Sequence, residues 1–431
     1  MTGLIPLIAA LALIEAGIRA GVHQASGRSL ALGLLIGALL IPLICETGSR
    51  IAARCRSRWP AALDRWEVAV EVLILAWFAW LCLGLGWSSH HRAYSVALLP
   101  WVAAQMVCWF CLPAGLSGSG RRVHHLLHQL RYGLAPLLLA LPILDLCAWI
   151  GDSSGWATFL AGHLGQWANV AGSFLLAVAV LAVLPWLLML LWRAGPLPDG
   201  PLAEQLTSAC TRAGVPVAGL RLWPVAGGKS YNAMVLGLMP RLRYVLFTPD
   251  LLADLPPAQV EAVLGHELGH VRHRHLWLYL LFAITAGLGS WTLADPVRLI
   301  LHQLPGLATW SPALLQGVIS LGLALAAWRL AFGILSRACE RQADLAGATM
   351  VNDPLIMCAA LSAVSEAAGH EPESSNWRHG SIAARIRWLQ ELCADGQVAV
   401  RHERLMRFAW VLLVATATGF GFAALHRGLP I

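Results

Sequence analysis

Nine apolar stretches, each about as long as a membrane-spanning helix, constrain the fold of this chain more than any other feature. A helix needs about 20 apolar residues to cross a hydrocarbon core of roughly 30 Å. The stretches lie at about residues 3–22, 29–46, 67–87, 94–114, 133–151, 169–192, 276–294, 312–335 and 406–425. The sequence therefore predicts a mainly α, polytopic membrane protein with about nine transmembrane helices.

The composition supports this class. Hydrophobic residues make up 58% of the 431 residues and charged residues only 12%, which excludes an ordinary soluble globular protein. The net charge of +7 is therefore no sign of nucleic-acid binding, and the expected surroundings are a lipid bilayer. We expect six helices in an N-terminal bundle over residues 1–194, two more over 276–335, and a last one over 404–431.

The arginines predict the orientation in the membrane. They gather after the second, fourth and sixth apolar stretches and before the seventh: Arg50, Arg54, Arg56, Arg58, Arg65, Arg121, Arg122, Arg131, Arg193, Arg272 and Arg274. Because cytoplasmic loops carry an excess of basic residues, one assignment fits all of them, with the N-terminus inside and the C-terminus outside. Two less apolar inserts, 195–275 and 336–403, then both face the cytoplasm.

The first insert contains short strands followed by a helix. A helix over 201–213 is followed by runs rich in Val, Leu and Tyr at 220–225, 232–238 and 243–248, which favour strands. Pro257 is tolerated in the first turn of the helix that follows. We expect the two inserts to form one small α+β domain.

That helix carries the clearest chemical signal, His266-Glu267-Leu268-Gly269-His270. Residues four apart share a helix face, so both imidazoles can reach one metal ion, and Glu267 is placed to take a proton from water. A third histidine at position 276 would indicate a metzincin, but Leu276 stands there. The third ligand must then come from elsewhere. We expect His273 and His275 to lie on a solvated face near the membrane and not to serve as additional ligands.

A later carboxylate can complete this site. Glu340 and Asp344 are four apart in the second insert and share a helix face. Glu340 is the natural third ligand, and Asp344 can accept a hydrogen bond from the N–H of a ligating imidazole and so fix its tautomer. Two histidines and a carboxylate suit zinc, with a fourth position left open for water.

At this point the sequence resembles a known family. H-E-L-G-H, two membrane helices and then Ser336-Arg-x-x-Glu340-x-x-Ala343-Asp344 are similar to the order found in the CAAX prenyl protease type I and HtpX-like zinc metallopeptidases, over roughly residues 202–392. The family has H-P where this chain has His379-Gly380. The six N-terminal helices exceed those of the shorter bacterial members.

The resemblance implies a gluzincin-type endopeptidase with one Zn²⁺ per chain, held by His266, His270 and Glu340. It also implies that Glu267 activates a zinc-bound water and that His379 donates to the developing oxyanion. Asp344 would support the site, and Arg385 would fix His379 or bind substrate backbone. Asn232 and Ala233 would begin the edge strand that binds substrate backbone. Surface, packing or strand-end roles for His379, Arg385 and Asn232 remain open.

The expected partners are a peptide or membrane-protein substrate and the lipid bilayer, with no nucleic acid, while the oligomeric state stays open. We expect a multi-pass protein of a bacterial inner membrane whose catalytic domain faces the cytoplasm. Two alternatives differ in function: a regulatory metalloprotease of a signalling system, and a non-catalytic scaffold with a vestigial metal site. The short outside loops speak against the first, and the intact Glu267 against the second.

Overall fold

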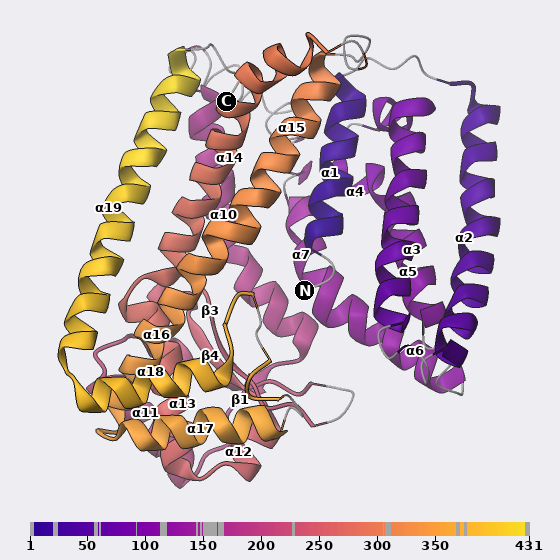
Figure 1. Ribbon diagram of the computed structural model, residues 1–431. Coiled ribbons are helices and arrows are strands. Elements are labelled where there is room, and N and C mark those ends of the chain that lie inside the picture. Colours follow the sequence, from indigo (N-terminus) through magenta and orange to yellow (C-terminus); the bar gives the residue numbers. More distant parts are fainter. Residues whose placement is uncertain are drawn as a thin grey trace. The chain divides into compact units, whose positions relative to one another are not determined.

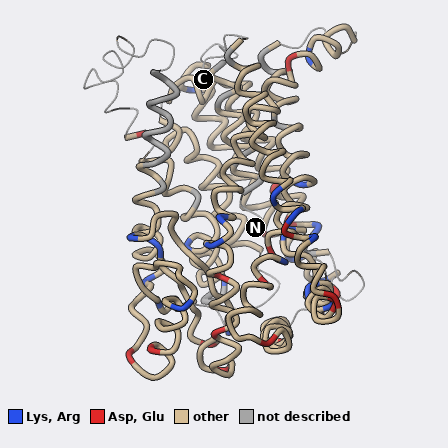
Figure 2. Tube along the Cα trace, turned by 90° about the vertical axis from the view of Figure 1, so that its left-hand side faces the viewer, with Lys and Arg blue, Asp and Glu red and all other residues tan. Residues whose placement is uncertain are grey.

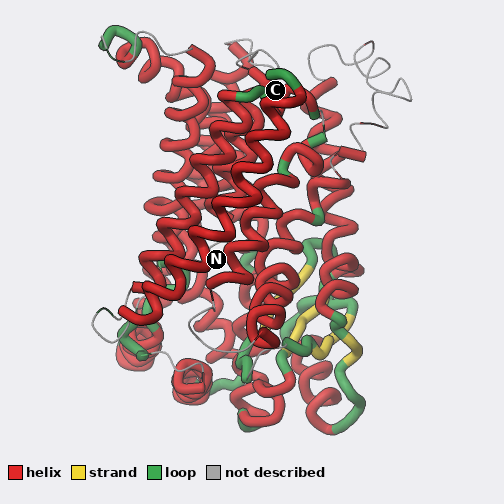
Figure 3. Tube along the Cα trace, turned by 90° about the vertical axis from the view of Figure 1, so that its right-hand side faces the viewer, coloured by secondary structure: helices red, strands yellow, loops and turns green. Residues whose placement is uncertain are grey.

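The computed structural model describes residues 4–19, 25–55, 59, 62–91, 93–112, 119–143, 145–146, 149, 162, 168–225, 229–304, 306, 312–367, 371–374 and 377–426. Within these ranges helices dominate and the strands form one small sheet (Figure 3), so the prediction of a mainly α chain is confirmed. The chain divides into two compact units: Met1–Leu176 with Ala294–Leu321, and Ala177–Leu293 with Gly322–Ile431.

Among the described residues, five helices are long and apolar enough to cross a membrane. They are Gly27–Cys55, Arg65–Gly84, His275–Leu301, Leu315–Met350 and Gln397–Ala424. Charged residues are scarce along the long helices and gather towards their ends (Figure 2). The chain is therefore an integral membrane protein. The count of nine spans stays a prediction, and the expected span at 133–151 lies partly outside the described residues.

The first unit is a helical bundle. Its elements are α1 (Leu4–Arg19), α2 (Gly27–Cys55), α3 (Ala62–Ala79), η1 (Trp80–Gly84), η2 (Trp87–His90), α4 (Tyr94–Ala97), α5 (Leu99–Cys111), α6 (Ser119–His128), η4 (Gln129–Leu134) and α7 (Ala135–Leu138). Small residues let α2 and α3 approach closely. The indole N–H of Trp77 donates to the carbonyl of Gly33 at 3.1 Å, and its ring fills the space beside Gly37.

The second unit holds a four-stranded sheet built from β1 (Gly195–Pro196), β2 (Gly219–Leu222), β3 (Ala233–Leu236) and β4 (Tyr244–Phe247). Its order is β1-β2-β4-β3, so β3 is an edge strand. β2 and β4 are parallel, while β1 pairs antiparallel with β2 and β3 with β4. The three predicted strands are confirmed; the two-residue β1 was not predicted.

The described helices after residue 168 include those that lie beside this sheet and those that lead away from it (Figure 1). They are α10 (Ala168–Trp192), α11 (Pro201–Arg212), α12 (Pro249–Asp254), α13 (Pro257–Arg272), α14 (His275–Leu301), α15 (Pro312–Ala327), the π-helical turn η7 (Trp328–Phe332), α16 (Gly333–Met350), α17 (Pro354–Ala367), α18 (Ile382–Ala394) and α19 (Gln397–His426). The 3₁₀ turn η6 (Pro240–Leu242) links β3 to β4. Leu264 and Leu268 of α13 belong to the apolar core that contains Phe247 of β4.

Two elements are longer than the sequence predicted. α2 continues to Cys55, through residues expected to form a basic loop, and α19 begins at Gln397 and not near residue 406. Hydropathy marks where a helix is apolar, whereas the helix itself runs on into polar sequence wherever the backbone can keep its hydrogen bonds.

Glycines bring α13 and α16 unusually close together. A Cβ added at Gly265 would lie 2.9 Å from the Cα of Gly347, and one at Gly269 would lie 2.7 Å from the Cβ of Ala346. Because a side chain at either position would push the helices apart, these glycines set the distance between the two helices that carry the expected metal ligands.

Candidate metal centre and active-site cleft

Three possible metal ligands meet between α13 and α16. The Nε2 atoms of His266 and His270 are 3.2 Å apart, and the Glu340 carboxylate oxygens lie 3.6 Å from the first and 3.8 Å from the second. These three residues form the one His/Cys/Asp/Glu group among the described residues whose ligand atoms all lie within 4.8 Å of one another. The sequence expectation that Glu340 would join the two histidines therefore agrees with their placement.

Glu267 lies between this group and the sheet. Its Oε2 accepts the backbone N–H of Val235 in edge strand β3 at 3.1 Å. Burial raises the pKa of Glu267 to about 7, and the nearby negative charge of Glu340 adds to this, while His266 and the Val235 N–H oppose it. A carboxylate with a pKa near neutrality can both accept and return a proton.

Asp344 and Arg385 support the first histidine. The Nδ1 atom of His266 lies 2.9 Å from Asp344 Oδ1, and the fully buried Asp344 is held by Arg385 through bonds of 2.8 and 2.5 Å. Burial opposes the charged imidazole of His266, but Asp344 outweighs this effect and raises the pKa. Arg385 also lies 3.3 Å from Glu340, so one guanidinium stabilises both carboxylates.

His379 lies beside Glu340. Its Nδ1 is 2.9 Å from Glu340 Oε1, and its side chain is 43% exposed. An ionised carboxylate can only accept, so Nδ1–H donates and Nε2 is left for another partner.

Asn232 and Ala233, the two residues expected to bind substrate, differ in which edge of β3 their backbone N–H and C=O groups face. Both backbone groups of Asn232 bond to Thr248, so only its side chain is available. In an antiparallel pair successive residues face opposite edges. Since Asn232 faces β4 and Val235 faces Glu267, the backbone of Ala233 faces the outer edge of the sheet.

A cleft of about 530 Å³ opens over this group, between β3, α13, α17 and the segment that precedes α18. His266, Glu267, His270, Glu340, His379 and Arg385 all line it. The opposite wall is apolar and includes Met357, Leu361 and Val364 of α17. The cleft thus combines a polar floor of carboxylates, histidines and Arg385 with a wall suited to apolar side chains.

His275 is a correction to the sequence analysis. The solvated position expected for it is wrong, because the side chain is fully buried. Its Nδ1 lies 2.8 Å from His270 Nδ1, and its Nε2 lies 2.9 Å from Gln342 Oε1. His273 is partly buried and stacks on His275 with ring centroids 5.8 Å apart.

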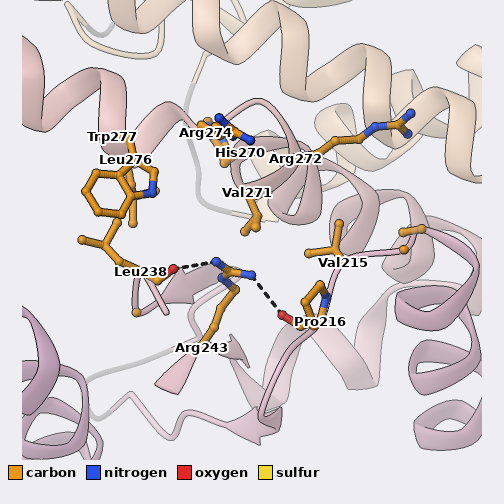
Figure 4. Close-up of a pocket in the computed structure, with 13 residues that line it drawn as sticks. Val215, Pro216, Leu238, Arg243, His270, Val271, Arg272, Arg274, Leu276 and Trp277 are labelled. Carbon is orange, nitrogen blue, oxygen red and sulfur yellow. Dashed lines mark hydrogen bonds between the residues drawn. The ribbon is translucent and has the colours of Figure 1, made fainter. Parts of the chain in front are cut away.

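A second cavity, of about 410 Å³, lies at the other end of β3 and also reaches His270 (Figure 4). Arg243 is 9% exposed there, and its guanidinium donates to the carbonyl oxygens of Pro216 at 3.0 Å and Leu238 at 2.6 Å. Arg243 therefore holds the segment that follows β3 in place.

Comparison with known proteins agrees with the motifs. Residues 196–393 match Peptidase family M48. A protease HtpX homologue of Pyrobaculum islandicum is 33% identical over 109 residues, covering 25% of this chain and 30% of the relative. A protease HtpX homologue of Acidiphilium cryptum is 27% identical over 268 residues, covering 59% of this chain and 85% of the relative. Protease HtpX of Legionella pneumophila is 28% identical over 188 residues, covering 43% and 65%.

The crystal structure of Ste24p from S. mikatae aligns with a TM-score of 0.46 and 15% identity, over 88% of this chain and 98% of that one. The chain spans only 30% and 56% of the length of two Pyrobaculum relatives that it matches. The chain is thus similar to HtpX proteases, and its residues 196–393 match Peptidase family M48.

Proposed function

We propose that this chain is an integral-membrane, zinc-dependent endopeptidase that hydrolyses peptide bonds of membrane-associated proteins or peptides. The observation that carries the proposal is the group of His266, His270 and Glu340 with Glu267 beside it, next to an edge strand.

The donor set fits zinc. Ligands about 2.0–2.2 Å from a tetrahedral zinc lie roughly 3.3 Å from one another. The distances between the three donor groups, 3.2, 3.6 and 3.8 Å, are close to this value. The chemistry also fits, since two imidazoles and one carboxylate leave a fourth position free in catalytic sites.

Zinc held by these residues would polarise the substrate carbonyl and lower the pKa of water. Glu267 takes the proton from the attacking water as the new C–O bond forms. When the C–N bond breaks, Glu267 returns that proton to the leaving amine nitrogen, so the carboxylate is regenerated. Its pKa of about 7 suits both transfers.

Two residues assist at the carbonyl. His379 donates to the oxygen as negative charge develops, a stabilisation of about 3 kcal/mol where such donors have been removed from other hydrolases. Because its Nδ1–H already donates to Glu340, this role needs a second proton on the ring or the release of Nδ1. Arg385 keeps Glu340 and Asp344 ionised and in place.

Strand β3 orients the substrate. An extended peptide lying along its outer edge can bond with the backbone of Ala233 and with the carbonyl of Val235, as in other peptide complexes that extend a sheet. The side chain of Asn232 lines the same cleft. The apolar wall on α17 favours hydrophobic substrate residues next to the cleaved bond.

The proposed setting is a bacterial inner membrane, with the peptidase elements facing the cytoplasm. The basic residues Arg272 and Arg274, just before the candidate membrane-spanning helix α14, support this orientation.

Replacement of Glu267 tests the proposal. Wild type and Glu267→Gln, purified in detergent, are compared for zinc content and for cleavage of an unfolded protein such as casein and of membrane-protein fragments. We expect both proteins to bind zinc and only wild type to cleave, because the amide cannot accept the proton. Equal cleavage by the two would exclude the mechanism.

A further inference from the structure

A continuous line of hydrogen bonds leads from His270 in the proposed metal centre to α19. His270 Nδ1 is 2.8 Å from His275 Nδ1, His275 Nε2 is 2.9 Å from Gln342 Oε1, and Gln342 Nε2 is 3.0 Å from Glu403 Oε2. The four residues come from α13, α14, α16 and α19. His275 and Gln342 are 0% and 4% exposed, so the bond between them is shielded from water, and the bonds to His270 and Glu403 are partly buried.

The carboxylate at the end of this line fixes the direction of every bond. Glu403 can only accept, so the Gln342 amide turns its N–H towards it and its oxygen towards His275. His275 must then donate through Nε2–H, and its bare Nδ1 accepts the Nδ1–H of His270. His270 is left with a bare Nε2, the atom that faces His266 and Glu340.

We propose that His275 is a positioning residue that fixes the tautomer and the ring orientation of His270, and that Gln342 and Glu403 hold His275 in the form that can do so. The inference rests on the metal site of the proposed function.

The two histidines of the centre are thus supported differently. His266 is oriented directly by a carboxylate, Asp344, whereas His270 is oriented by a neutral imidazole whose carboxylate lies two bonds further on. Partners of this kind keep a ligand in its metal-binding tautomer and raise its basicity. α14 and α19 are candidate membrane spans, and both pack against α16 through Leu278, Cys339 and Met406, so the orientation of His270 also depends on this packing.

The test uses the full-length protein in detergent, with zinc alone as the probe. Zinc affinity is measured by competition with a chelator of known affinity, and the visible spectrum of the Co²⁺-loaded protein reports on the ligand field. The variants are His275→Phe, which fills the space without bonding, and His275→Gln, whose amide can accept from His270 and donate to Gln342. Glu403→Gln removes only the distant charge. His273→Gln is the matched control, because it removes a ring that stacks on His275 but none of the bonds in the line.

We expect zinc affinity to fall about 10- to 100-fold in His275→Phe, to recover in part in His275→Gln, and to stay unchanged in His273→Gln. Glu403→Gln should shift the Co²⁺ bands while leaving the melting temperature of the metal-free protein unchanged, which a purely structural role would not do. If His275→Phe does not fold, His275→Gln and Glu403→Gln decide the matter by the same two readouts.

Wild-type affinity and an unchanged Co²⁺ spectrum in the folded His275 variants and in Glu403→Gln would overturn this inference and leave the proposed function standing. A wild-type protein that binds no zinc would overturn both.

Discussion

The contact between α13 and α16 can be tested with one methyl group. Gly269 lies between the two histidines of the metal helix, and a Cβ there would come within 2.7 Å of Ala346 Cβ and 3.0 Å of Ala343 Cα. Carbon contacts are ordinarily 3.4 Å or longer, so α16 must move by about 0.7 Å in Gly269→Ala, the difference between 3.4 and 2.7 Å. No flexible side chain is available to yield instead.

This displacement is large for a metal site, since ligand distances vary by only about 0.2 Å. Overpacking of this size costs about 1–3 kcal/mol, and alanine returns about 0.8–1 kcal/mol of helix propensity. We therefore expect a net loss of up to about 2 kcal/mol, which corresponds to a zinc affinity up to about thirtyfold weaker if the loss falls on the metal-bound state.

Thermal unfolding in detergent and chelator competition measure the two effects. The matched control is Gly287→Ala in α14, where an added Cβ meets no atom within 4 Å; its melting temperature should stay level or rise slightly. If Gly269→Ala behaves like Gly287→Ala in both assays, the glycine contact does not set the ligand spacing.

Three further predictions concern the charges and the metal. Arg385→Gln should destabilise the protein by about 3–5 kcal/mol, because Asp344 is left buried without its partner. Arg385→Lys should not restore stability, since lysine cannot bond bidentately. Denaturant unfolding measures both variants, and stabilities equal to that of wild type would contradict this prediction. Glu267 is a base only when ionised, so kcat/KM should fall about tenfold per pH unit below the pKa of Glu267. That pKa is about 7 without metal, and bound zinc should lower it because zinc favours the ionised carboxylate. A pH profile of cleavage from 5 to 9 that stays flat on its acid side would argue against this role. Removal of metal with a chelator should lower the melting temperature. Zinc at a hundredfold excess over its dissociation constant should restore about 2.7 kcal/mol of folding stability. An unchanged melting curve would mean that the folded protein binds no zinc.

Local periodicity made the candidate metal ligands visible in the sequence. The spacing of His266 and His270, and of Glu340 and Asp344, depends only on both segments being helical, and both are. What spacing could not supply was the distance between the two helices, which the glycines at 265, 269 and 347 determine.

The position of His275 could not be predicted, because it depends on an unusual turn. α13 ends at Arg272, Arg274 takes a positive φ of 58°, and α14 begins at His275. Arginine is not a residue that favours the left-handed region, so the sequence gives no sign of a turn there. That turn directs His275 into the protein.

Hydropathy alone also could not predict the helix lengths. The third apolar stretch is interrupted by a π-helical segment at Trp80–Gly84, and the fourth is divided into α4 and α5. Hydropathy averages over such breaks, because it records composition and not the path of the backbone hydrogen bonds.

Zinc content per chain, measured on purified wild type, Glu340→Ala and the exposed control Glu391→Ala, tests the proposed centre most directly. We predict about one zinc in wild type and in Glu391→Ala, and a clear loss in Glu340→Ala, because one of the three protein ligands is gone. Full zinc occupancy and unchanged affinity in Glu340→Ala would show that α16 does not supply the third ligand.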